Sequence, residues 1–354
     1  MNALASLMVK RIDASGPMSL ADFMTEALLH PQHGYYTTQD AIGARGDFTT
    51  APEISQMFGE MIGLSLAQAW LDQGSPPAFA LAELGPGRGT LMADILRATA
   101  QVPGFRDAAQ VHLVEASPRL RADQAKQTGD ADPRWHDDVT TLPDAPLFVV
   151  ANEFFDALPI RQFQRDPGGW REVQVGVQDG GLGLGLSAPA PIALLDHRLD
   201  DTSPGDIVEQ CPAAAPIAEA LAQRIAFHGG MALIIDYGDW RSLGDTFQAV
   251  QDHKSVDPFA APGQADLTAH VDFEALAQAA SPAKHTKLTP QGVFLERLGI
   301  TQRAQALAQR LSGATLDAHI AAHRRLTHPA EMGSLFKVLG LYPDGAPLPP
   351  GFAP

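Results

Sequence analysis

Cysteine is almost absent from this chain of 354 residues, which contains only Cys211. A single thiol cannot close an intramolecular disulfide, and it cannot supply the paired thiolates of a structural zinc site. The twelve histidines form no His-Glu-x-x-His motif, the usual zinc pattern on a helix. The sequence therefore predicts neither a disulfide framework nor a metal centre.

Long apolar runs are also missing, since none approaches the ~18 residues that a transmembrane helix needs. The first residues, MNALASLMVKRIDASG, place their basic side chains after a very short apolar stretch, which is not a secretory pattern. Asp13 comes early for an organelle-targeting peptide, because such peptides are poor in acids. We therefore expect a cytoplasmic protein that does not insert into a membrane.

Positive charge is scarce in this sequence. Lys and Arg total 25 against 41 Asp and Glu, which gives a formal net charge of −16. Binding to the phosphates of a nucleic acid requires clustered Lys and Arg, so the composition argues against non-specific nucleic-acid binding. An acidic field favours cationic partners, and solubility alone is the simpler explanation for it.

The first 77 residues have mainly helical periodicity. In SLADFMTEALLH, Ser19 is expected to cap a helix whose apolar positions recur at helical spacing. Further along, TTAPE resembles a capping box, in which Thr50 caps the next helix and Glu53 reaches back to it. We expect residues 1–77 to form a helical N-terminal region.

From residue 78 onward, short apolar runs alternate with helical stretches. AFALAEL, VHLVEA, PLFVVANE and GGMALIID are predicted strands, the last of them ending at Asp236. Strands that alternate with helices predict an α/β fold with a Rossmann-like parallel sheet over residues 78–354. Two segments interrupt this pattern: an insertion at about 161–210, with a hairpin turn at Asp179-Gly180, and a long loop at about 252–273.

A glycine-rich loop, LAELGPGRGTL, follows the first predicted strand of this core. Gly85, Gly87 and Gly89 alternate with other residues, so backbone could approach a bound group closely. A triphosphate loop would have a lysine after its last glycine, whereas Thr90 follows here. A dinucleotide loop would place its third glycine at Thr90, and this difference alone leaves dinucleotides open.

Acidic residues at the strand ends discriminate better than the glycines. Glu83 lies two residues before Gly85, where a carboxylate repels a pyrophosphate but suits a cationic amino-acid group. Glu115 ends the next strand and could accept hydrogen bonds from both hydroxyls of a ribose. S-Adenosyl-L-methionine carries a ribose, an amino-acid tail and a sulfonium, and it has no phosphate. These residues therefore predict S-adenosyl-L-methionine as the cofactor.

A third group of polar residues, in ANEFFDALP, supplies the candidate catalytic side chains. Asn152, Glu153 and Asp156 would lie beside the cofactor at the end of a strand. Methyl transfer requires mainly that the nucleophile be held close and aligned, and carboxylates hold a guanidinium through paired hydrogen bonds. The alternative is a turn cluster that starts the next helix.

The short segment HDD offers a candidate for the adenine. One of Asp137 and Asp138 could contact the adenine amino group, and we assign Asp137 to the cofactor site. A surface turn is an equally good explanation of this segment.

Several long blocks of the sequence resemble the MidA-type family of S-adenosylmethionine-dependent methyltransferases. They occur in the order GDFTTAPEISQMFGEMIG, LAELGPGRGTLMADILR, VHLVEASPRLRADQ, NEFFDALPIRQF, DHKSVDPFAAPGQADLTAHVDF and MGSLFKVLGL. The resemblance implies a class I methyltransferase core with a helical N-terminal part and an inserted subdomain. It also implies that Glu83 and the three glycines lie at the cofactor, and that the segment with Gly46, Asp47 and Thr50 borders it.

The same resemblance implies a substrate. The family includes a mitochondrial protein arginine methyltransferase that makes symmetric dimethylarginine on a core subunit of respiratory complex I. By similarity, the partner of this chain would be a protein with an accessible arginine, such as a complex I core subunit. A homodimer is left open, as are two other functions. These are a non-catalytic assembly protein on the same fold, and a nicotinamide-dependent oxidoreductase, which Glu83 disfavours.

Overall fold

The computed structural model describes residues 1–38 and 50–354, which divide into two compact units. The first comprises Met1–Phe48, Asp156–Ala214 and Arg241–Asp272, and the second comprises Thr49–Phe155, Ala215–Trp240 and Phe273–Pro354. These boundaries differ from those expected from the sequence. Helix α5 (Gln56–Asp72) belongs with the Rossmann-like sheet because its buried apolar side chains pack into the same core.

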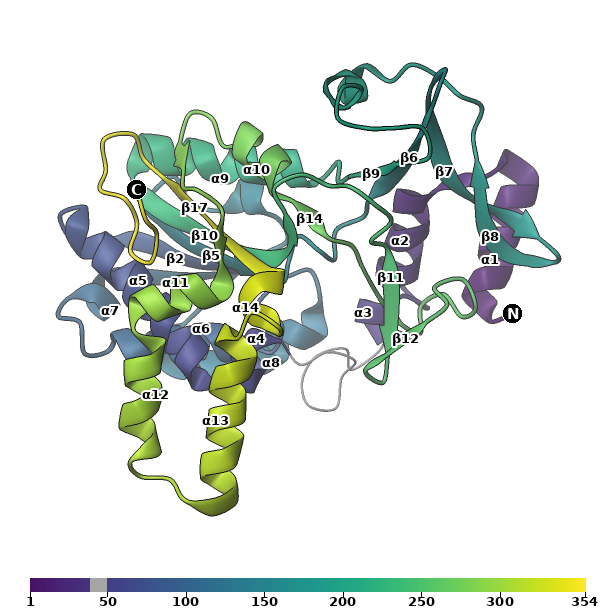
Figure 1. Ribbon diagram of the computed structural model, residues 1–354. Helices are drawn as coiled ribbons and strands as arrows, with labels where there is room; N and C mark the ends of the chain where they lie inside the picture. Colours follow the sequence, from purple (N-terminus) through teal and green to yellow (C-terminus); the bar gives the residue numbers. More distant parts are fainter. Residues whose placement is uncertain (39–49) are drawn as a thin grey trace. The chain divides into compact units, whose positions relative to one another are not determined.

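The second unit is built around a mostly parallel sheet with the strand order β15-β17-β10-β5-β2-β3-β4 (Figure 1). Strands β10, β5, β2, β3 and β4 are parallel, and β17 is antiparallel to β10. The strands are β2 (Phe79–Leu84), β3 (Ala109–Val114), β4 (Arg134–His136), β5 (Leu147–Asn152), β10 (Gly230–Asp239), β15 (Lys284–His285), β16 (Thr289–Pro290) and β17 (Phe336–Tyr342).

The order of these strands reverses between β2 and β5. From β2 the chain continues to β3 and β4 on one side, and it then returns to β5 and β10 on the other side. In an open α/β sheet, ligands bind at such a reversal, beyond the carboxyl ends of the strands. The topology therefore predicts a ligand site among the residues that follow β2 and β5.

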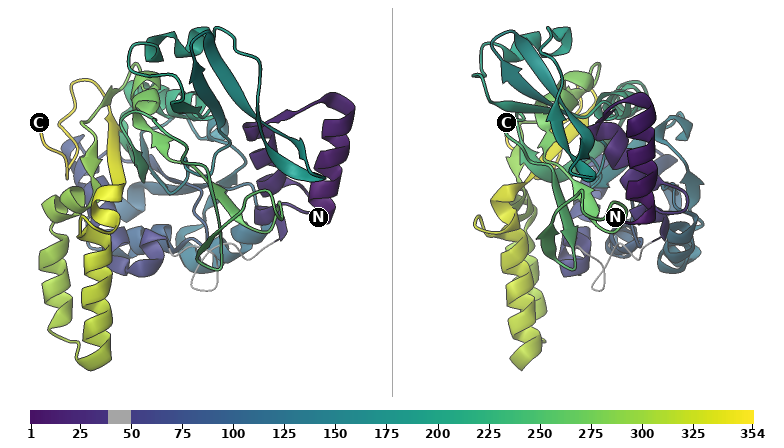
Figure 2. Two further views of the ribbon diagram at one scale, coloured as in Figure 1. Left: turned by 45° about the vertical axis from the view of Figure 1, so that its right-hand side comes forward. Right: turned by 90° about the vertical axis from the view of Figure 1, so that its right-hand side faces the viewer.

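Helices cover both faces of this sheet in Figure 1. Alternate strand residues such as Leu81, Leu113 and Val150 share a buried apolar cluster with side chains of α5 and α6. The helices are α4 (Ala51–Ile54), α5, α6 (Thr90–Thr99), α7 (Phe105–Ala108), α8 (Pro118–Thr128), α9 (Ala214–His228), α10 (Phe273–Ala279), α11 (Gln291–Leu298), α12 (Ile300–Ala308), α13 (Gly313–Thr327) and α14 (Met332–Leu335). Figure 1 and the left view of Figure 2 show α12 and α13 side by side as a helical hairpin.

The first unit contains short helices and two small antiparallel sheets. One sheet has the order β1-β7-β6-β9, with β8 also paired to β7, and the other has the order β12-β11-β13. The elements are α1 (Ala3–Ser15), β1 (Met18–Ser19), α2 (Leu20–Leu29), α3 (Tyr35–Thr38), β6 (Arg161–Asp166), β7 (Gly169–Gln178), β8 (Gly181–Leu186), β9 (Ile207–Gln210), β11 (Gln248–Gln251), β12 (Lys254–Val256), β13 (Asp266–Thr268) and β14 (Val271–Asp272). Thus the segment expected to be a long loop contains three short strands.

Two local predictions in the first unit are confirmed. Ser19 caps α2, and its side chain accepts a hydrogen bond from the backbone N–H of Asp22 at 3.0 Å. Asp179 and Gly180 join β7 to β8 with φ angles of 50° and 78°, the left-handed pair that a two-residue hairpin requires. Within the described residues, no helix combines the length and apolar character needed to span a membrane.

Candidate functional site

The glycine loop turns the chain sharply from β2 into α6. Gly85, Gly87 and Gly89 have φ angles of 61°, 52° and 85°. These lie in the left-handed region, which residues with a side chain rarely adopt. A Cβ atom on Gly85 would lie 2.9 Å from Cδ2 of Phe154, which is too close for an unstrained contact. The loop therefore requires glycine at its first position for both conformation and space.

Glu83 lies at the end of β2 with only 3% of its surface exposed. Burial raises the pKa of Glu83 to about 8, although its carboxyl group accepts a hydrogen bond from the backbone N–H of Met92 in α6. The nearby Glu115 raises this pKa further. Oε2 of Glu83 has no hydrogen-bond partner among residues 1–38 and 50–354. A buried carboxyl oxygen in this situation is well suited to a cationic or N–H-bearing ligand.

Glu115 follows β3 directly and is held by two donors. Its Oε1 accepts from the backbone N–H of Ser117 at 2.8 Å, and its Oε2 accepts from Nε2 of Gln124 at 3.2 Å. Burial is the largest influence on Glu115 and raises its pKa, against the effect of these hydrogen bonds. Gln124 is fully buried and also donates to the carbonyl of Gly87 at 2.8 Å, so it ties the glycine loop to Glu115.

The two aspartates after β4 differ in their contacts. The Asp137 side chain is 85% exposed and pairs with Nη2 of Arg121 at 2.5 Å. Asp138 instead caps the short 3-10 helix Val139–Thr141, where it accepts from the backbone N–H of Thr140 at 2.7 Å. Each aspartate thus has a partner within the chain, and the assignment of Asp137 to the adenine stays a prediction.

Asn152 and Glu153 meet at the end of β5. Nδ2 of Asn152 donates to Oε1 of Glu153 at 3.0 Å, and the same oxygen accepts from the backbone N–H of Ala51 at 3.0 Å. Oδ1 of Asn152 is buried and has no partner in the described part of the chain. Asn152 follows Val150 by two residues, as Glu83 follows Leu81, so both side chains emerge on the face of the sheet that α5 and α6 cover.

The capping box predicted at TTAPE is wrong. Thr50 is the N-cap of α4, but its side chain makes no capping hydrogen bond. Glu53 accepts from the hydroxyl of Thr90 at 2.5 Å instead of reaching back to Thr50, and Glu153 satisfies the N–H of Ala51. Tertiary contacts have thus replaced the local ones. The other two residues predicted for this border of the cofactor, Gly46 and Asp47, lie outside the described residues.

Asp156 belongs to the first unit, whereas Asn152 and Glu153 belong to the second. It is buried, and its backbone carbonyl accepts from the N–H of Ala269 at 3.0 Å. Burial, together with the carboxylates of Asp266 and Asp156, raises the pKa of Tyr36 well above its usual value. The contacts described for Asp156 all lie within its own unit, and its catalytic role stays a prediction.

Sequence reasoning missed three residues that hold this site together: Gln124, Arg121 and Asp236. Helix α8 is too hydrophilic for an apolar stripe to mark its buried face, so nothing distinguished Gln124. Arg121 donates from Nε to the carbonyl of Glu115 at 2.7 Å, a contact that depends on the turn after β3. The pattern around Asp236 predicts only a strand end, although an acid within the apolar run ALIIDYG is itself a usable signal.

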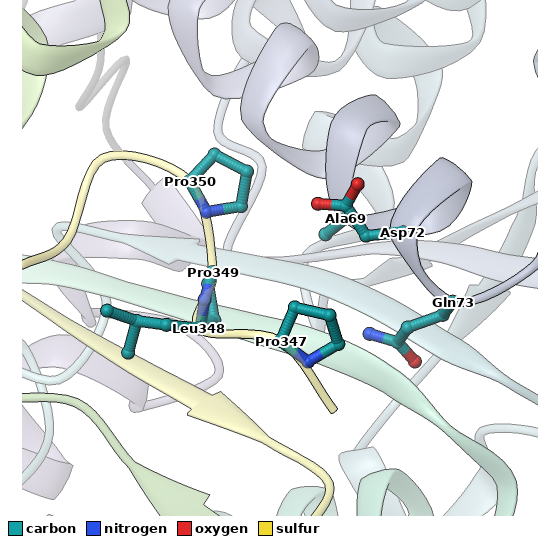
Figure 3. Close-up of a pocket in the computed structure, with 7 residues that line it drawn as sticks. All are labelled: Ala69, Asp72, Gln73, Pro347, Leu348, Pro349 and Pro350. Carbon is teal, nitrogen blue, oxygen red and sulfur yellow. The ribbon is translucent and has the colours of Figure 1, made fainter. Parts of the chain in front are cut away.

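A small pocket lies elsewhere in the second unit, between the end of α5 and the C-terminal segment (Figure 3). Its polar lining is already engaged, because Asp72 accepts from Gln68 and Gln73 exchanges hydrogen bonds with the backbone of Gly230. The facing segment is rich in proline, and the carbonyl of Pro350 accepts from Ser65 at 3.1 Å. The pocket therefore marks where the C-terminal segment packs and gives no sign of a ligand.

The fold and the strand-end site together define a class of protein. A Rossmann-like sheet, a glycine loop at the strand reversal, and a buried and a half-buried acid beside it suit a phosphate-free adenosyl cofactor, and they define a class I methyltransferase. A family model of S-adenosyl-L-methionine-dependent methyltransferases matches residues 61–292. The chain belongs to this MidA-type family of methyltransferases, and S-adenosyl-L-methionine is its methyl donor.

Known relatives extend over nearly the whole chain. The mitochondrial protein arginine methyltransferase NDUFAF7 of Homo sapiens is 39% identical over 372 residues, which cover 96% of this chain and 83% of the human protein. That of Xenopus laevis is 37% identical over 97% of this chain and 85% of its own length. A protein from Burkholderia thailandensis, solved with S-adenosyl-homocysteine bound, has a TM-score of 0.83 at 29% identity, covering 99% of this chain and 94% of that one.

These relatives correct the cytoplasmic location expected from the sequence. The curated relatives are named as mitochondrial proteins, and their similarity to this chain is high. The expectation relied on the composition of the first few residues. Targeting signals are read by receptors and removed, so the folded chain and its composition do not report location reliably.

Proposed function

We propose that this chain is a protein arginine N-methyltransferase. The observation that carries the proposal is the pair of buried oxygens without partners in the described residues, Oε2 of Glu83 and Oδ1 of Asn152. Both belong to side chains on one face of neighbouring strands, at the reversal of the sheet. One suits the cationic end of the cofactor, and the other suits an N–H of the acceptor. The arginine methyltransferase names of the relatives support the same conclusion.

The residues around the glycine loop would hold the cofactor. Gly85, Gly87 and Gly89 let the backbone approach it, and Glu83 would bind its ammonium group. Glu115 would accept from the ribose hydroxyls, for which Gln124 and Ser117 already fix the carboxylate. We further propose that Asp137 contacts the adenine and that Gly46, Asp47 and Thr50 border the cofactor.

Asn152, Glu153 and Asp156 would position the acceptor. The bound cofactor would supply an electrophilic methyl group. A guanidine nitrogen would form a bond to this carbon as the C–S bond breaks, S-adenosyl-homocysteine would be the leaving group, and the nitrogen would release a proton to water. Alignment of that nitrogen is the main task of the protein. Oδ1 of Asn152 accepts a hydrogen bond from N–H, and the carboxylates favour the planar cation of arginine over a neutral side chain.

For the substrate, we propose an arginine on a respiratory complex I core subunit, converted to symmetric dimethylarginine. The family resemblance and the names of the relatives support this choice. The net charge of −16 is compatible with a target segment that carries arginine. A homodimer remains an open alternative for the active form.

The test is direct transfer of a labelled methyl group to a purified complex I core subunit. We expect hydrolysis of the product to give monomethylarginine and symmetric dimethylarginine. The Gly85→Val chain should give neither, because its side chain conflicts with the φ angle and with Phe154. Labelled lysine or asymmetric dimethylarginine would contradict the proposal. Tight binding of S-adenosyl-homocysteine without any methylated product would favour the non-catalytic assembly function.

A further inference from the structure

The turn that follows β5 is held by the end of β10. Three consecutive backbone N–H groups of the turn donate to this strand. Glu153 donates to the carbonyl of Ile235 at 2.9 Å, and Phe154 and Phe155 donate to Oδ2 of Asp236 at 3.2 and 3.0 Å. The backbone of the turn is therefore fixed by one neighbouring strand and one carboxylate.

Asp236 is fully buried, and both of its oxygens accept from backbone donors. Its Oδ1 accepts from the N–H of Tyr237 at 3.0 Å, while Oδ2 serves the two phenylalanines. A carboxylate can accept at both oxygens, whereas an amide of the same shape has only one accepting atom. Asparagine at this position would turn an NH₂ group toward a backbone donor, so the contacts require the charged side chain.

The turn adopts a conformation that its sequence does not favour. Glu153 has a φ angle of 52°, in the left-handed region that a glutamate rarely occupies. Such a residue keeps this conformation only where its surroundings enforce it. The ring of Phe154, next along the turn, lies against Gly85, so the same conformation also determines how the turn meets the glycine loop.

The turn also fixes the orientation of Asn152. Its amide must direct Nδ2 toward Oε1 of Glu153, because a carboxylate accepts hydrogen bonds and an amide oxygen cannot donate one. Oδ1 is then directed away from Glu153 and is left buried without a partner in the described residues. A change in the backbone at Glu153 would move its carboxylate and release the amide from this orientation.

We propose that Asp236 is a positioning residue for methyl transfer. Its carboxylate holds the turn Glu153–Phe155, the turn places the Glu153 carboxylate, and Glu153 orients Oδ1 of Asn152 toward the N–H of the acceptor. The inference rests on the proposed function for the nature of the acceptor. It assigns a role to a buried residue that acts through the turn.

The test compares the whole chain carrying Asp236→Asn with the matched control Asp239→Asn, an exposed aspartate on the same strand. In the first measurement, hydrogen exchange at the amides of Phe154 and Phe155 should lose about tenfold in protection in Asp236→Asn, while the β5–β10 ladder stays protected. In the second, single-turnover methylation of the arginine substrate at saturating cofactor should slow by about a hundredfold. The affinity for S-adenosyl-homocysteine, measured by calorimetry, should stay close to that of the unmodified chain.

A purely structural role for Asp236 predicts a different pattern. Global stability, cofactor affinity and rate would then fall together, and this result would overturn the proposal, as would unchanged exchange at Phe154 and Phe155. If Asp236→Asn does not fold, Asp236→Glu keeps the charge and is judged by the same two measurements. Absence of methyl transfer by the unmodified chain would instead contradict the proposed function, and the exchange experiment would still decide whether Asp236 fixes the turn.

Discussion

At Glu83, the position in the sequence, the burial of the side chain and the chemistry of the carboxyl group all indicate the same kind of ligand. Its place two residues before Gly85 argues against a pyrophosphate, and burial raises its pKa to about 8. Since the unfolded chain would titrate near 4.5, the folded protein retains a proton between these two values. The unfolding free energy should therefore fall as pH rises from about 4.5 to about 8, by roughly 1.4 kcal/mol per pH unit at most.

The same ionisation predicts a pH-dependent affinity for the cofactor product. Binding of the ammonium group of S-adenosyl-homocysteine should ionise Glu83 and release one proton. The association constant should therefore rise by up to about tenfold per pH unit between pH 6 and 8 and level off above pH 8, where Glu83 is already ionised. Isothermal calorimetry across this pH range measures the association constant.

Glu83→Gln provides the matched comparison for that experiment. The amide should bind S-adenosyl-homocysteine weakly at every pH and abolish the slope, and the free protein should become less sensitive to pH between 4.5 and 8. Glu219→Gln, at an exposed position on α9, should keep the slope of the unmodified chain. A flat profile in the unmodified chain would show that Glu83 does not ionise on binding.

At the scale of elements, ionic contacts to one buried carboxylate tie helices together. Glu60 on α5 has 4% of its side chain exposed, and it accepts from Nη1 of Arg97 on α6 at 2.8 Å and from Nε of Arg303 on α12 at 2.7 Å. Burial acts to raise the pKa of Glu60, but the hydrogen bonds from Arg303 and Arg97 outweigh it and the pKa is lowered. One carboxylate thus joins three helices of the second unit.

Glu60→Gln should lower the unfolding free energy by about 1 to 2 kcal/mol at pH 7, because it removes a buried charge that two arginines share, while the arginines, at 46% and 40% exposed, stay hydrated. The lowered pKa means that this stabilisation is present above pH 4.5 and is lost as the pH falls through the folded value. Urea denaturation at pH 7 and at pH 4 measures the difference. Equal losses of unfolding free energy at both pH values would show that glutamine destabilises the chain for a reason other than the missing charge.

At the scale of the whole molecule, net charge restricts the partners. A chain with 41 acidic and 25 basic side chains presents an acidic field, and the similarity to arginine methyltransferases indicates protein substrates in its relatives. The location expected from composition was wrong, whereas the cofactor and the enzyme class inferred from the glycine loop and its acids are confirmed by the family. Local motifs predict the cofactor and the reaction well because the cofactor imposes direct chemical requirements on them.

The charge also predicts no affinity for nucleic acid. At about 0.15 M salt, we expect no shift of double-stranded DNA or RNA in a gel at micromolar protein, because few phosphates could be neutralised. A complex whose affinity falls steeply with salt would contradict this expectation. A basic DNA-binding domain of similar size serves as the positive control.

The strands and glycine loop could be predicted because their signals are local. Phe79–Leu84 is a strand and Thr90–Thr99 is a helix because apolar spacing and the glycines between them decide both within twenty residues. The position of Glu83 at a strand end followed from the same pattern. The capping of α4 could not be predicted in this way, because Glu153, which binds the N–H of Ala51, is 102 residues away.

The sequence by itself determined the α/β class, the phosphate-free cofactor and the strand-end acids, since each depends on neighbouring residues. Only the tertiary structure decided that Asn152 presents a buried oxygen without a partner in the described residues, and that Asp236 holds the turn beside it. The hydrogen bond from Phe155 to Asp236 spans 81 residues and exists because β5 and β10 are adjacent and parallel. Strand order, which no local pattern encodes, brings these side chains together.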